Sequence, residues 1–217
     1  MKGIIFSGRI NKLMPSDDPG ADRKAGLLLL LFLSAVIAGA ALGAVSSKYA
    51  DSGMMKKLDL IFLTNIQLRS SGNALALFTA SLASNFLFLL AVFLLGLTLW
   101  GEAAVIALPF LKGYGYGLIA GFIYSSCGVN GIIYNILVIL PGALVFAAVI
   151  SAASREAFMN SLKLCRLLRS GDEPEGCASG LQLKRYFISM LWLLFLTVLA
   201  CTVDMLLSLM LSWLFGF

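Results

Sequence analysis

Five long runs of apolar residues separate the few charged segments of this chain. The runs cover roughly residues 25–47, 74–99, 103–126, 131–153 and 186–210. Each is about 20 residues or longer, the length that an α-helix needs to cross the hydrocarbon core of a bilayer. Lipid offers the backbone no hydrogen-bond partners, so apolar runs of this length fold as helices. The sequence therefore predicts an all-α fold, a multi-pass transmembrane bundle of about five spans.

The composition agrees with a membrane protein that has no sizeable soluble domain. Hydrophobic residues make up 60% of the 217 residues, and charged residues only 12%. A soluble protein cannot bury that much apolar surface. We expect residues 1–24 to form a polar tail and residues 25–217 to form the membrane domain. The tail is a poor signal peptide, because its charged leader is far from an apolar run that is too long.

Two polar connections interrupt the apolar runs. Within residues 48–73, apolar side chains recur roughly on one side of a helix, which predicts an amphipathic helix on the membrane surface. Within residues 154–185, the first part reads as a basic amphipathic helix suited to anionic lipid. The stretch GDEPEGCASG that follows it reads as a turn.

The basic residues predict the orientation of the chain. The tail holds five lysines and arginines, the 154–185 connection holds six, and the 48–73 connection holds four. In a five-span chain, the tail and the 154–185 connection lie on the same side of the membrane. Lysine and arginine are enriched in cytoplasmic connections. We therefore expect the N-terminus inside and the C-terminus outside, in a cell membrane. The net charge of +5 reflects this arrangement rather than nucleic-acid binding.

The residue types argue against catalysis. The chain has no histidine, which excludes Ser-His and Cys-His catalysis and histidine metal sites. It has no G-x-S-x-G motif and no pair of aspartates within the spans. The cysteines form no C-x-x-C pair, so a metal or redox site is not expected; they are Cys127, Cys165, Cys177 and Cys201. We expect no enzyme, no metal and no cofactor.

Glycines spaced by four residues mark two helix faces. Gly39 and Gly43 share a face of the first span, and Gly113, Gly117 and Gly121 share a face of the third. Small residues at this spacing let another helix approach the backbone closely. The sequence leaves two interpretations of these faces open: packing within this bundle, or docking of a helix from another protein.

Lys112 lies inside the third span, about 13 Å along the helix. This depth approaches the middle of a core roughly 30 Å thick. A charge there costs at least about 2.5–3.5 kcal/mol. Three arrangements could offset the cost: snorkelling of the side chain to the cytoplasmic face, a carbonyl group freed by Pro109, or a carboxylate such as Glu102 or Asp204. A role in a solute pathway also stays open.

Other residues within the spans also need an explanation. Asn85, Asn135 and Asp204 are polar groups in apolar runs, so they are expected to face other helices. Pro109, and the pair Pro141 and Gly142, are expected to break their helices.

The order of these motifs resembles the stage II sporulation protein M family of spore-forming bacteria. The resemblance rests on LLGLTLWGE, ALPFLKGYGYGLIAGF and GVNGIIYNILVILPG, and covers about residues 25–153. The shared residues are Asn85, Gly96, Pro109, Phe110, Lys112, Gly113, Gly117, Gly128, Gly131, Leu140 and Pro141. Gly142 departs from the family pattern, which has a glutamine after the proline, so a role for that amide is in doubt here.

The resemblance implies five spans with the N-terminus inside, and a scaffold without chemistry of its own. Such a scaffold gathers the peptidoglycan-degrading stage II sporulation proteins D and P at the septum during engulfment. It lies in the mother-cell membrane. Membrane lipid is a further expected partner, nucleic acid is not, and a homo-oligomer stays open.

A transporter subunit is the rival interpretation. Proline and glycine interrupt two neighbouring spans, which can mark a substrate site. Lys112 would attract a small anionic solute. Against this interpretation, the sequence shows no clear inverted repeat.

Overall fold

The computed structural model describes residues 19–49, 74–98, 101–170 and 176–215. Its long helices are α1 (Pro19–Ser46), α4 (Ala74–Gly96), α5 (Gly101–Tyr134), α6 (Leu140–Ser170) and α7 (Gly176–Phe215). Each is long and apolar enough to cross a membrane. The expected all-α fold with five spans is therefore confirmed. The surface helix expected in 48–73 lies almost wholly outside the described residues.

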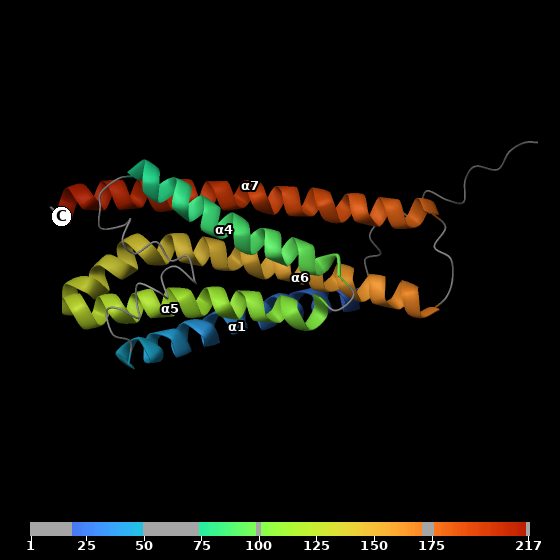
Figure 1. The fold of residues 1–217 in the computed structure, drawn as a ribbon, viewed down its shortest axis with the longest axis horizontal. Helices are drawn as coiled ribbons and strands as arrows, with labels where there is room; N and C mark the ends of the chain where they lie inside the picture. The colour runs from blue at the N-terminus through green and yellow to red at the C-terminus, as the bar shows by residue number, and fades with distance from the viewer. Residues whose placement is uncertain (1–18, 50–73, 99–100, 171–175, 216–217) are drawn as a thin grey trace, which may run out of the picture.

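Two short segments of other helical geometry adjoin the long helices. A 3₁₀ turn, η2 (Ser47–Tyr49), follows α1, and a π-helical segment, η3 (Asn135–Ile139), precedes α6. The long helices lie roughly along one axis, and α4 runs obliquely across α7 and α6 (Figure 1). The first residue of α1 and the last of α7 lie at opposite ends of the bundle, as an odd number of spans requires.

The chain reverses direction between the third and fourth spans at a single residue. Gly128 has φ 57° and ψ −133°, a backbone conformation that residues with a Cβ rarely adopt. From there the chain returns through η3 into α6, which lies beside α5 (Figure 1). The glycine thus permits the short connection that the predicted spans 103–126 and 131–153 leave between them.

The prolines do not act as predicted. Helix α5 continues through Pro109, and its only non-helical φ/ψ is at Gly128, so the break expected at Pro109 is wrong. The irregular backbone near Pro141 lies before the proline, in η3, while Pro141 and Gly142 belong to α6. Proline has no N–H to donate to the preceding turn, and a wider π turn accommodates that missing bond.

The 154–185 connection is also different from the prediction. Its first part is no separate amphipathic helix, because α6 continues without interruption to Ser170. Helix α7 begins at Gly176, ten residues before the expected start of span five at Tyr186. At 40 residues, α7 is about 60 Å long, twice the hydrocarbon thickness. Both helices therefore extend past the core, and their ends project beyond α4 and α5 (Figure 1).

The glycine faces of α1 and α5 pack against each other. A Cβ at Gly39 would overlap the carbonyl oxygen of Phe110, and one at Gly43 would overlap that of Tyr114. The same holds for the glycines of α5 against the backbone of α1: a Cβ at Gly117 would overlap the carbonyl oxygen of Ala40. Gly113 and Gly121 face Val36 and Ser47 of the first span in the same way. Both faces are occupied within the chain, so a helix from another protein does not dock on them here.

The apolar core lies where α4, α5, α6 and α7 meet. Its fully enclosed side chains include Phe32, Val92, Val105, Phe146 and Ile150. Phe32 and Val36 are the contributions of α1 to this core, and the ring of Phe32 meets that of Phe158 edge to face, with the ring centroids 6.1 Å apart. Most other large side chains of α1 are exposed, so this helix is held chiefly by its glycine contact with α5.

Replacing Gly117 by leucine tests the backbone contact between α1 and α5. The new side chain must displace the main chain of α1 at Ala40, which cannot shift cheaply. We expect a loss of about 1–3 kcal/mol or more in stability, measured as a lower melting temperature in detergent. Gly26→Leu is the matched control, because nothing lies within 4 Å of that position. Equal melting temperatures for the two variants would contradict the packing described.

Candidate functional site

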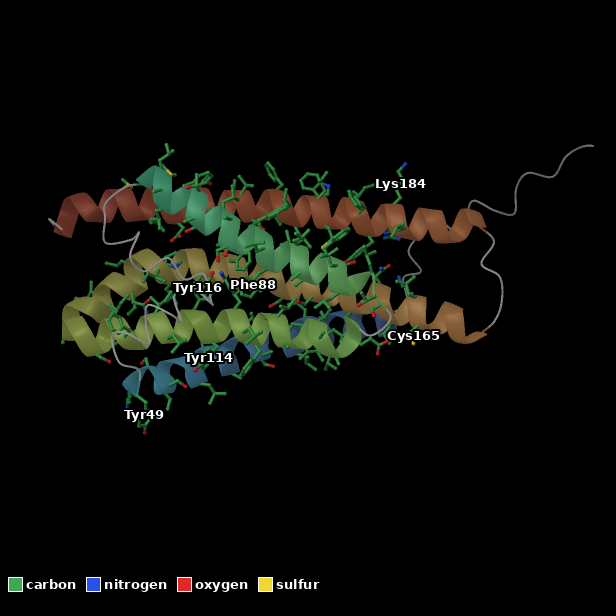
Figure 2. The ribbon with its side chains drawn as sticks, viewed as in Figure 1. Tyr49, Phe88, Tyr114, Tyr116, Cys165 and Lys184 are labelled. Carbon is green, nitrogen blue, oxygen red and sulfur yellow. The ribbon has the colours of Figure 1, made fainter. Side chains whose placement is uncertain are left out.

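The most unusual group in the bundle is the side chain of Lys112, which is 5% exposed. Its Nζ donates a hydrogen bond of 2.9 Å to the Ser84 hydroxyl on α4. Three aromatic rings surround the same atom: Phe88 at 4.6 Å, Tyr116 at 5.3 Å and Phe146 at 5.4 Å from the ring centroids. Figure 2 shows Phe88 and Tyr116 close together in the middle of the bundle. We call these four partners of the lysine the Lys112 cage.

The snorkelling of Lys112 to the cytoplasmic face, one of the three arrangements considered, is wrong, because the cage holds the side chain inside the bundle. The ammonium group points into the bundle and is held by side chains of α4, α5 and α6. A desolvated cation–π contact contributes about 2 kcal/mol, and a hydrogen bond from a charged group about 1.5–3 kcal/mol. Together these contributions match the cost of at least about 2.5–3.5 kcal/mol for placing the charge in the membrane.

A second buried polar pair joins α4 to α7. Asn85, adjacent to Ser84, donates from Nδ2 to the sulfur of Cys201 at 3.4 Å. One turn further along α7, Asp204 is buried and lies against α6. A Cβ at Gly142 would come within 2.9 Å of its carboxylate oxygen. Because glycine has no Cβ, position 142 leaves room for the Asp204 side chain. This is a structural reason for a glycine at the position where the family pattern has a glutamine.

Asn135 bridges the hairpin between α5 and α6. Its Nδ2 donates to the Tyr124 hydroxyl at 2.7 Å, across the reversal at Gly128. Asn135 is also the first residue of the π-helical segment. The bond thus fixes the two sides of the hairpin where the backbone is least regular.

Side chains of α6 and α7 satisfy the end of α4. The last carbonyl groups of a helix have no partner within it. Asn160 donates to the Gly96 carbonyl at 2.9 Å, and Ser161 to the Thr98 carbonyl at 2.8 Å. The Tyr186 hydroxyl donates to the Phe93 carbonyl at 3.1 Å, with the two rings stacked. This end of the bundle is therefore a joint of three helices.

Sequence reasoning found the polar residues but not most of their partners. It identified Asn85, Lys112, Asn135 and Asp204, and the structure buries all four. The aromatic and serine residues of the cage and joint were missed because phenylalanine, tyrosine and serine are ordinary in membrane helices; they are Phe88, Tyr116, Phe146, Ser161 and Tyr186. Asn160 was missed because it falls in the 154–185 segment that was read as a polar connection outside the spans. The adjacent polar pair Ser84 and Asn85 was the one available signal. Among the described residues, no group of acids and cysteines could hold a metal ion.

The contact between α6 and α7 at Gly142 can be tested by a double-mutant cycle. Gly142→Val should lower stability by about 1–3 kcal/mol, because the new methyl groups meet the Asp204 side chain. Adding Asp204→Ala should recover part of that loss, since it removes the obstructing carboxylate. Melting temperatures of the single and double variants provide the measurement. Strictly additive losses would show that the two positions do not meet.

The family model described as stage II sporulation protein M matches residues 28–208 of this chain. The match covers well over half of the 217 residues, and the chain belongs to this family. Searches of curated proteins and of solved structures found no match. Family membership indicates a sporulation-related protein, and the five apolar helices indicate a multi-pass membrane protein.

Proposed function

We propose that this member of the stage II sporulation protein M family is a non-enzymatic membrane scaffold for engulfment during endospore formation. It recruits and organises septal peptidoglycan-degrading proteins, and its partners are the stage II sporulation proteins D and P. Its place is the mother-cell membrane at the sporulation septum. The family match supports the link to sporulation; the scaffold role and the partners are the proposal.

The observation that carries the scaffold proposal is the interior of the bundle, where polar groups bond to one another across helices. Lys112 with Ser84 joins α5 to α4, and Asn85 with Cys201 joins α4 to α7. The joint at the end of α4 adds bonds from α6 and α7. Bonds of this kind hold helices in fixed relative positions, which suits a platform that presents docking surfaces.

The surfaces left for partners are the outward faces and the ends of the helices. Helix α7 exposes a broad apolar face that includes Leu191, Trp192, Phe195 and Leu206. The inner glycine faces are filled by α1 and α5 themselves. A membrane helix of a partner would therefore displace lipid from an outward face and pack there, without opening the bundle.

One observation favours the rival function. A buried lysine in a membrane bundle is a feature of solute pathways, and Lys112 would be the group that meets a small anion. The cage weighs against this function, because the ring faces that surround the ammonium group are the negative sides of the aromatic quadrupoles. An anion would have to approach past those faces.

Co-purification from sporulating cells tests the scaffold proposal. We expect the tagged chain, extracted in mild detergent, to recover the wall-degrading proteins D and P, identified by mass spectrometry. An unrelated tagged five-span protein at the same expression level is the control. Recovery of a nucleotide-binding ATPase without either wall-degrading protein would contradict the scaffold and support a transporter subunit.

Anion uptake into vesicles separates the two functions at a single residue. A scaffold predicts the same background uptake for the unmodified chain and for Lys112→Met. A transporter predicts uptake by the unmodified chain that falls at least tenfold in the variant. The second pattern would overturn the scaffold proposal.

A further inference from the structure

The chain that returns from the reversal at Gly128 carries a stripe of exposed aliphatic side chains. Their exposed fractions range from 40% to 71%. They follow the i, i+3, i+4, i+7 spacing of one helix face; they are Val129, Ile132, Ile133, Ile136, Leu137 and Leu140. Between the first and the last of them, the structure describes no exposed side chain that is polar or charged. We call these six residues the hairpin stripe.

The opposite face of the same segment holds it to the bundle. Its buried residues are Gly131, Asn135 and Ile139, which are four residues apart. Asn135 bonds to the Tyr124 hydroxyl, and Ile139 packs with Ile119 of α5. The hairpin stripe therefore faces away from the bundle, and the contacts on the opposite face fix its direction.

The length of α5 places the reversal relative to the membrane. Charged side chains mark the other end of the bundle, at the joint, where Glu102 lies in the first turn of α5 and Lys184 and Arg185 of α7 are exposed. From Gly101 to Gly128 the chain advances 27 residues, about 40 Å along the helix. The hydrocarbon core is about 30 Å thick, and about 40–45 Å with both headgroup layers. The reversal therefore lies at the level of the headgroups on the far side.

The length of α6 places the other end of the hairpin stripe. Leu140 precedes Asn160 of the joint by 20 residues, about 30 Å along the helix. This distance matches the thickness of the hydrocarbon core. The hairpin stripe thus extends from the far edge of the hydrocarbon, at Leu140, to the level of the headgroups, at Val129.

The segment that carries the hairpin stripe is inclined to the membrane. It runs obliquely to the bundle axis before the chain joins the line of α6 (Figure 1). It includes the π-helical segment η3, and π turns are a common cause of such bends. A helix that lies at the membrane surface buries one apolar face at the boundary between headgroups and acyl chains. The oblique direction and the aliphatic outer face both fit this arrangement.

The hairpin stripe is also continuous with the lipid-facing side of α6. Leu144, one turn after Leu140, is 60% exposed, and Val145 is 41% exposed. Leu144 lies about 24 Å from Asn160 along the helix, so its exposed side chain is within the hydrocarbon. The exposed aliphatic surface does not end there but continues to the tip of the hairpin. Lipid is therefore the occupant that covers the whole surface without a change of partner.

We propose that the hairpin stripe is a lipid-binding surface that holds the tip of the α5–α6 hairpin in the headgroup layer. Its aliphatic side chains lie against the upper carbons of the acyl chains. With the N-terminus inside, as the basic residues predict, this is the outer leaflet. The proposal concerns the membrane and not the proteins D and P, so it does not depend on the scaffold role.

Single cysteines in the full chain, reconstituted in phosphatidylcholine and phosphatidylglycerol vesicles, test this proposal. The four native cysteines are replaced by serine. Ile136→Cys, at the centre of the hairpin stripe, is the test position. Lys163→Cys is the reference for water, because this exposed residue lies past the joint on α6. Leu144→Cys is the reference for the hydrocarbon.

The first measurement is labelling by a water-soluble thiol reagent present on both sides of the vesicles. We expect Ile136→Cys to react at least tenfold more slowly than Lys163→Cys, because lipid covers the thiol. A rate within threefold of that of Lys163→Cys would overturn the proposal, since the surface would then be open to water.

The second measurement separates lipid from protein as the cover. A small, membrane-permeant fluorophore is attached to each cysteine, and the vesicles contain phospholipid with a nitroxide on an upper carbon of its acyl chain. We expect this lipid to quench the fluorophore at position 136 at least threefold more strongly than at position 163. Slow labelling without such quenching would overturn the proposal, because a second copy or another part of the chain would then cover the stripe.

A second position protects the result against a local effect of one substitution. Ile133→Cys lies on the same face and is 41% exposed. We expect it to behave as Ile136→Cys does in both measurements. Labelling of Ile133→Cys at the rate of Lys163→Cys would contradict a lipid cover over the whole stripe.

Discussion

Lipid offers no hydrogen-bond partners, and this constraint decides how the polar groups of the bundle are arranged. Lys112 of α5 contacts a hydroxyl and three aromatic rings, and the amide of Asn85 on α4 donates to a thiol. The carbonyl groups at the end of α4 accept hydrogen bonds from side chains of two other helices. Among the described side chains, only the Ser154 hydroxyl is buried without a bond. Since each pair joins different helices, satisfying the polar groups also fixes the packing of the bundle.

The glycine contact between α1 and α5 complements these polar bonds. It brings two backbones together at Gly39, Gly43 and Gly117 and involves no charge. Helix α1 is otherwise largely exposed on its outer side, so this close approach is what attaches it. The bundle thus combines a polar interior around α4 with an apolar backbone contact at its edge. Both occupy inner surfaces of the bundle, so the partners proposed above would have to bind the outward faces and the helix ends.

The sequence was sufficient for the helices but not for their mutual contacts. Length and apolarity determine the five spans, and four-residue glycine spacing identifies the two close-packing faces, because both signals are local. The partners of Lys112 come from α4 and α6, and nothing local in Phe88 or Phe146 marks them as cage residues. The break expected at Pro109 was wrong for a similar reason, since neighbouring helices in a membrane bundle allow a helix to continue through a proline.

The central claim is that the interior of this family member is a closed structural core, and its accessibility to water tests that claim most directly. Ser84→Cys keeps Lys112 and places a thiol at a position that is 2% exposed within the cage. A membrane-impermeant thiol reagent, applied from either side, should leave this cysteine unmodified while it labels Tyr49→Cys, at a site that is 85% exposed. Labelling of both positions at similar rates would show a hydrated path to the lysine and would contradict the account.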